Sequence, residues 1–83
     1  MNKFEMDLAA NAFALKYKRE KAFYLGIYRN GKHTYALGWN NPPKSYGGGT
    51  MIVHYDESAP DKFVFINENR VLDAIVYFGG QEH

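Results

Sequence analysis

Residues 23–39 read FYLGIYRNGKHTYALGW, two aromatic-rich segments joined by Asn30-Gly31, a dipeptide typical of β-hairpin turns. A two-residue turn there would place Arg29 opposite Lys32, two like charges, and would put the large side chains of the two strands on different faces. A three-residue loop, Arg29-Asn30-Gly31, with a left-handed Gly31 in a G1 bulge, reverses this parity. Because a small domain must bury one face of the hairpin, we predict the three-residue loop.

This loop decides which side chains of the hairpin face the core. The side chains predicted to share the core face are Phe23, Leu25, Ile27, Tyr35, Leu37 and Trp39. The side chains predicted on the reverse face are Tyr24, Gly26, Tyr28, Thr34, Ala36 and Gly38. We expect this flatter face to be the seat of a helix or, through its two tyrosines, a contact surface for a partner.

The segment before the hairpin predicts a helix from Asn2 or Lys3 through about Lys18. Four apolar residues recur there at helical spacing: Phe4, Leu8, Ala12 and Leu15. Glu5 lies in the first turn, where the helix dipole favours an acid. Residues 12–18 also alternate like a strand, so a strand is the alternative for this segment.

The segment after the hairpin predicts one long loop and two strands. Residues 40–50, NNPPKSYGGGT, form a flexible Pro/Gly loop. Its GGGT end leads into a strand rather than a helix, so we expect a connector and not a phosphate-binding loop. Strands are predicted at 51–55 and 62–67, with a turn at 56–61.

A second helix is predicted over Glu68–Phe78, with Asn67 as its N-cap and Gly79 as its C-terminal stop. One side of this helix is lined by Val71, Leu72, Ile75 and Phe78. The tail, residues 79–83, is expected to fray. The predicted fold is one small α+β domain over residues 1–83, with an N-terminal helix, a four-stranded antiparallel β-meander and a C-terminal helix.

The composition restricts the class of protein. The chain has 83 residues and no cysteine, which excludes disulfides, thiolate zinc sites and a thiol nucleophile. Small secreted domains usually depend on disulfides, so we expect a cytoplasmic protein. The first residues lack the long apolar run of a signal peptide, and no stretch approaches the roughly 20 apolar residues of a membrane span. We therefore expect no membrane partner.

The histidines offer the only hint of catalysis. His54, Asp56 and Ser58 invite comparison with a hydrolytic triad, but no nucleophile elbow or oxyanion hole accompanies them. His33, His54 and His83 lack the spacing of metal ligands. We therefore predict no catalytic residues, no metal site, no cofactor and no enzymatic activity.

Aromatic and basic residues are the candidates for contact with a partner. Residues 1–50 carry eight Lys or Arg and three Asp or Glu, whereas residues 51–83 carry two and six. This asymmetry would suit steering of a partner or pairing of two copies in a homodimer. The residues predicted to bind a partner are Tyr24, Tyr28, Lys16, Lys18, Arg19, Lys21, Lys44 and Tyr46.

Two functions fit these residues. Tyrosine and arginine dominate the energetics of protein interfaces, which favours a non-enzymatic module that binds a larger intracellular protein and acts by steric occlusion. The alternative is a single-stranded nucleic-acid-binding protein, in which bases stack on tyrosines beside basic groups. A pI of about 8.0 is low for that role.

In size and composition only, the chain is similar to small phage-encoded or mobile-element-encoded inhibitors of host machinery, anti-CRISPR proteins among them. This similarity implies an inhibitor that acts in the host cell cytoplasm. No residue pattern in the chain carries it.

Overall fold

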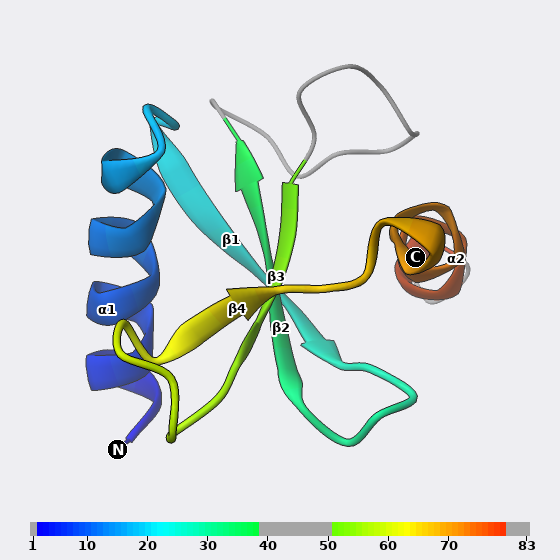
Figure 1. Ribbon diagram of the computed structural model, residues 1–83, viewed down its shortest axis with the longest axis horizontal. Helices are drawn as coiled ribbons and strands as arrows, with labels where there is room; N and C mark the ends of the chain where they lie inside the picture. Colours follow the sequence, from blue (N-terminus) through cyan, green and yellow to red (C-terminus); the bar gives the residue numbers. More distant parts are fainter. Residues whose placement is uncertain (1, 39–50, 80–83) are drawn as a thin grey trace.

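The computed structural model describes residues 2–38 and 51–79 and places a four-stranded antiparallel sheet between two helices (Figure 1). The elements are α1 (Lys3–Lys16), β1 (Lys21–Ile27), β2 (His33–Gly38), β3 (Met51–Tyr55), β4 (Phe63–Phe65) and α2 (Glu68–Gly79). The strand order β1-β2-β3-β4 is that of a meander, so the predicted α+β architecture is confirmed. Trp39, the loop at 40–50 and the tail at 80–83 lie outside the described residues.

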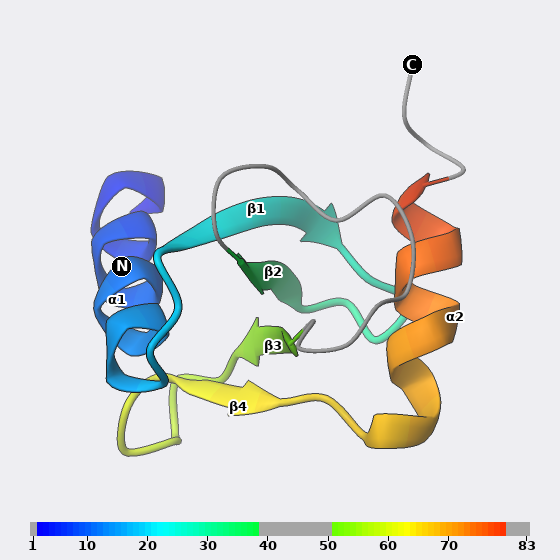
Figure 2. The same ribbon diagram turned by 90° about the horizontal axis from the view of Figure 1, so that it is seen from above.

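The helices cover opposite faces of the sheet, and each has its own core (Figures 1 and 2). The core beneath α1 consists of Met6, Ala10, Phe13, Ala14, Ala22, Tyr35, Leu37, Val53 and Phe63. The core beneath α2 consists of Tyr28, Ala36, Ile52, Ile66, Ala74, Ile75 and Phe78. Successive residues of β2 and β3 alternate between the two cores, as the pleat of a strand requires.

Both ends of α1 are closed by specific caps. The side chain of Asn2 accepts a hydrogen bond from the Glu5 backbone N–H, and the Glu5 side chain accepts one from the Asn2 backbone, which makes a capping box. At the other end, Lys18 adopts the left-handed conformation at φ 60°. Its N–H donates to the Leu15 carbonyl and that of Arg19 to the Ala14 carbonyl, the pattern of a Schellman motif. The expected helix therefore forms but ends at Lys16, and the strand alternative for 12–18 is wrong.

The apolar residues whose spacing predicts α1 are not the ones that it buries. Three of these four residues are largely exposed, Phe4 at 70%, Leu8 at 57% and Leu15 at 67%, and Ala12 is exposed as well. The buried residues of α1 are Met6, Ala10, Phe13 and Ala14. Two of these are alanines and two, Met6 and Phe13, are large, so the buried line and the exposed line of α1 both contain large apolar side chains.

The hairpin loop has the predicted geometry. Gly31 has a φ of +80°, and its N–H donates to the Tyr28 carbonyl at 2.9 Å. The Tyr28 N–H donates to the Lys32 carbonyl at 3.1 Å, so Tyr28 and Lys32 flank a three-residue loop. These bonds confirm the loop of Arg29-Asn30-Gly31.

A second irregularity lies inside β1, and it changes which side chains of this strand share a face with Tyr35. Tyr24 pairs with Tyr35 and Gly26 with Thr34, so one extra residue, Leu25, bulges between them. Ile27 consequently shares the face of Tyr35, as predicted.

Phe23 and Leu25 lie on the face opposite the one predicted. Phe23 pairs with Ala36, on the α2 side, and Leu25 packs against the core beneath α2. The predicted core face of the first strand is therefore wrong for Phe23 and Leu25. Ile27 shares the face of Tyr35, but it is 52% exposed and is not part of a core.

A polar contact joins α1 to the sheet. The buried Tyr35 hydroxyl donates to the Asp7 carboxylate of α1, and Lys3 lies 2.8 Å from the same carboxylate. Burial, and then Asp7, raises the pKa of Tyr35. Burial would raise the pKa of Asp7, but its bonds with Lys3 and Tyr35 bring that pKa below its ordinary value. Tyr35 thus remains a neutral donor to an ionised acid.

Candidate interaction surface

The structure separates the two tyrosines on which the predicted contact surface depended. Tyr28 is only 3% exposed and lies in the core beneath α2. Its hydroxyl donates to Asp73 of α2, whose carboxylate is also 3.1 Å from Arg29 Nε. The prediction that Tyr28 is exposed to a partner is wrong, because α2 occupies that face of the sheet.

Tyr24 lies on the other face, beside α1. Its ring packs on that of Tyr35, with centroids 5.2 Å apart, and Lys3 Nζ sits 4.2 Å above its centroid. Its hydroxyl is 2.8 Å from His33 Nδ1. Tyr24 keeps an exposed part, but it shares no surface with Tyr28.

The predicted basic residues lie together where α1 ends and β1 begins. Lys16, Lys18 and Lys21 are exposed there, and Arg19 is half-buried. Lys16 forms an ion pair with Asp61, at 2.7 Å. The other two predicted residues, Lys44 and Tyr46, lie outside the described residues. Partner binding by the basic group stays a prediction.

In the part of the chain that the structure describes, Ser58 bonds to Asp56 and not to His54 of β3. Ser58 directs both its backbone N–H and its hydroxyl to the Asp56 carboxylate, at 3.0 and 2.7 Å. Burial, and then Lys32, lowers the pKa of His54, whose buried Nδ1 has no hydrogen-bond partner among residues 2–38 and 51–79. The same residues contain no group of three or more His, Cys, Asp or Glu that could hold a metal ion.

The surface that the sequence prediction missed is the outer face of α1. Phe4, Leu8, Ala12 and Leu15 form an apolar line along the exposed side of the helix, which we call the outer stripe. Spacings of four, four and three residues keep these side chains within one side of a 3.6-residue helix. The signal was in the sequence, because α1 carries two apolar lines at helical spacing and the sheet can bury only one.

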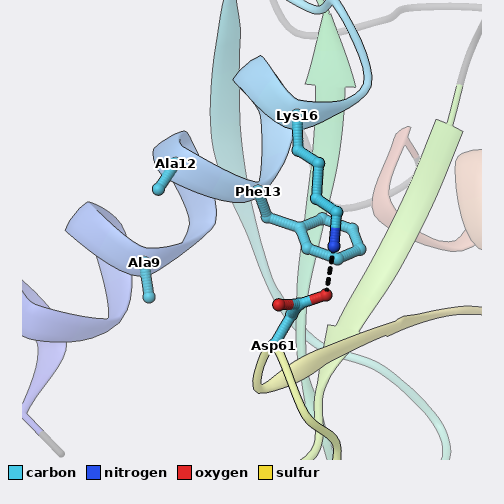
Figure 3. Close-up of a pocket in the computed structure, with 5 residues that line it drawn as sticks. All are labelled: Ala9, Ala12, Phe13, Lys16 and Asp61. Carbon is cyan, nitrogen blue, oxygen red and sulfur yellow. Dashed lines mark hydrogen bonds and ion pairs between the residues drawn. The ribbon is translucent and has the colours of Figure 1, made fainter.

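A shallow groove borders the outer stripe (Figure 3). It lies between α1 and the turn that joins β3 to β4, and its volume is about 210 Å³. It is lined by Ala9, Ala12, Phe13, Lys16 and Asp61. Ala12 belongs to both features, and the ion pair of Lys16 with Asp61 crosses the groove at one end. The stripe and the groove form a continuous apolar surface with a charged rim.

The outer surface of α2 offers a smaller apolar area. Leu72 is 56% exposed, and Val76 is exposed beside it one turn later. The buried residues of α2 are Ala74, Ile75 and Phe78. Two residues on one turn make a weaker candidate than the four residues along α1.

Comparison of the chain with known protein families, curated protein sequences and solved structures finds no match. Neither helix in the described parts of the chain has the length and apolar character needed to span a membrane.

Proposed function

We propose that this chain is a non-enzymatic protein-binding module, and that the outer stripe of α1 is its contact surface. The observation that carries the proposal is the exposure of Phe4, Leu8 and Leu15 along one line of a helix that already buries a different face. Contiguous exposed apolar side chains on a folded domain usually mark an interaction site. An amphipathic helix commonly docks through residues spaced three and four apart.

The neighbouring features support a protein partner over a nucleic acid. Stacking of bases requires exposed rings beside basic groups, yet Tyr28 is buried and Tyr24 already lies beneath Lys3. The outer stripe itself carries no charge, which suits an apolar protein surface better than a phosphate backbone.

Steric occlusion of a larger protein, the role predicted from the sequence, stays a prediction. It would follow if that protein placed a functional groove over α1. Inhibition of a host process is one form that such binding would take.

Two variants matched in residue type and exposure test the proposal. Leu8 is 57% exposed on α1 and Leu72 is 56% exposed on α2, so Leu8→Glu and Leu72→Glu introduce the same charge at comparably exposed sites. We expect an immobilised Leu72→Glu protein to retain the same proteins from the source cell as the unmodified chain. The Leu8→Glu protein should lose them.

Thermal unfolding of both variants serves as the control, because neither position is part of a core. If the three proteins retain the same set from the lysate, measured by quantitative mass spectrometry, the outer stripe is not the contact surface.

A further inference from the structure

We infer that the partner fitted by the outer stripe is a second copy of this chain, with the two α1 helices packed antiparallel about a two-fold axis. This inference rests on the proposed function, because it names the occupant of the same surface. Its grounds are the order of side-chain sizes along α1 and the positions of two charges beside the stripe.

The sizes of the outer-stripe residues are self-complementary in the antiparallel direction. Phe4 and Leu15 lie at the two ends, and Leu8 and Ala12 lie between them. An antiparallel pair sets Phe4 against the partner's Leu15 and Leu8 against the partner's Ala12, so a large residue meets a small one at the centre. Interdigitation of this kind allows helices to approach to within van der Waals contact.

The groove adds room at that point. Ala12, which the partner's Leu8 would meet, is one of the residues that line it, and Phe13 is another. In a two-fold pair each groove receives one leucine, so the same contact forms twice.

Glu5 and Lys16 provide the charge complementarity. They are eleven residues apart, which is close to three helical turns, so they lie on the same side of the outer stripe. In the antiparallel pair each Glu5 faces the partner's Lys16. A parallel pair would leave these two groups at opposite ends of the interface.

Both groups retain bonding capacity for this contact. Glu5 uses one carboxylate oxygen in the capping box, where Oε1 accepts from the Asn2 N–H at 3.1 Å. Lys16 has three N–H donors, of which one goes to Asp61 at 2.7 Å. An ion pair across the two-fold axis is therefore compatible with the bonds that each chain makes within itself.

The first experiment measures the mass of the full chain in solution by sedimentation equilibrium, up to about 1 mM, because a single pair of short helices buries less than about 1,200 Å² and should associate weakly. We expect a monomer–dimer equilibrium. Leu8→Glu should raise the dimer Kd by roughly 100-fold, and Leu72→Glu should leave it unchanged. An unmodified chain that stays monomeric over the whole range, or a Leu8→Glu chain whose dimer Kd equals that of the unmodified chain, overturns the inference.

The second experiment tests the antiparallel direction by charge exchange. Glu5→Lys and Lys16→Glu each set like charges opposite one another at two places, and each should raise the Kd roughly tenfold. An equimolar mixture of the two variants should form a heterodimer, because every facing pair is again of opposite charge. The bonds within each chain are the same before and after mixing, so recovery reports only the contact between chains.

Absence of a heterodimer in native mass spectrometry of the mixture overturns the antiparallel arrangement. The outcomes also separate this inference from the proposed function. A monomeric chain whose Leu8→Glu variant still loses proteins from the lysate refutes the dimer and leaves the binding module standing. A monomeric chain whose variants retain identical proteins refutes both.

Discussion

Gly26 is the residue on which the path of β1 depends. Its φ of +129° lies in a region that other residues rarely adopt, and a Cβ added there would lie 3.2 Å from Phe78 Cε1. The first property lets the strand bulge at Leu25, and the second lets α2 lie close to the sheet. Both are consequences of a missing side chain.

Gly26→Ala should therefore be more destabilising than Gly31→Ala. Gly31 also has a positive φ, +80°, but a Cβ there would meet no atom within 4 Å. We expect a loss of about 1–2 kcal/mol at Gly31, from backbone strain alone, and about 2–3 kcal/mol at Gly26. Urea unfolding of the two variants measures the difference in their free energies of unfolding. Equal losses of stability would show that the Phe78 ring moves aside without destabilising the fold.

Lys18 is a residue whose replacement should stabilise the protein. It occupies the left-handed position after α1 with a φ of 60°, where glycine is the usual residue. Lys18→Gly removes strain from the folded state but adds freedom to the unfolded chain, so we expect a net gain of about 0.5 kcal/mol. A rise in the urea midpoint with unchanged slope would support this, and a fall would mean that the lysine side chain makes a contact worth more than the strain.

At the scale of elements, α1 illustrates what the sequence predicts well and where prediction fails. Its existence follows from Asn2 at the start, Glu5 in the first turn and the helical spacing of the apolar residues, and the helix is confirmed. Its orientation does not follow, because both apolar lines satisfy the same periodicity. The sheet buries the line that contains Met6 and Phe13, and it leaves the line of Phe4, Leu8, Ala12 and Leu15 exposed.

The hairpin shows a related difficulty. The three-residue loop was predicted from burial of one hairpin face, and the loop is confirmed although helices cover both faces of the sheet. The bulge at Leu25 reverses the facing a second time, and its signal was the isolated Gly26 within a strand. A one-residue bulge exchanges the two faces of a strand for every residue beyond it. Because the bulge is missed, Phe23 and Leu25 are predicted on the wrong face, and Tyr24 and Tyr28 appear to share a surface.

The contact between the hairpin and α2 should depend on pH. The Tyr28 hydroxyl, and then Arg29, lowers the pKa of Asp73 below its ordinary value of 3.8. A lowered pKa in the folded state contributes stability above the unfolded pKa, and this contribution is lost as the pH falls through the folded pKa. Asp73→Asn should therefore be less stable than the unmodified protein at neutral pH, with a difference that narrows below pH 3.8.

Thermal unfolding from neutral pH to about pH 3 tests this dependence. Tyr28→Phe provides the partner for a double-mutant cycle. The double variant should lose less stability than the sum of the two single losses, because each substitution removes the same hydrogen bond between Tyr28 and Asp73. A difference that stays constant as the pH falls would show that the Asp73 charge contributes nothing.

At the scale of the whole molecule, two cores share one sheet. Leu37 belongs to the core beneath α1 and Ile52 to the core beneath α2, and both are about 1% exposed. They sit on adjacent central strands, so loss of either core exposes the sheet that supports the other. The two cores should therefore unfold together.

Leu37→Ala and Ile52→Ala should each cost about 2–5 kcal/mol and leave a single unfolding transition. Methyl signals from α1 and α2, followed by NMR during urea unfolding, should disappear at the same midpoint in each variant. Separate midpoints for the two helices would mean that the cores fold independently.

The bulge at Leu25 lies on β1, one of the two outer strands of the sheet, and the other, β4, is only three residues long. Amyloid growth on a folded protein needs a long, regular outer strand as its template, and this sheet offers none within the described residues. Any fibril of this protein should consequently arise from unfolded chains, and its rate should follow the population of unfolded molecules.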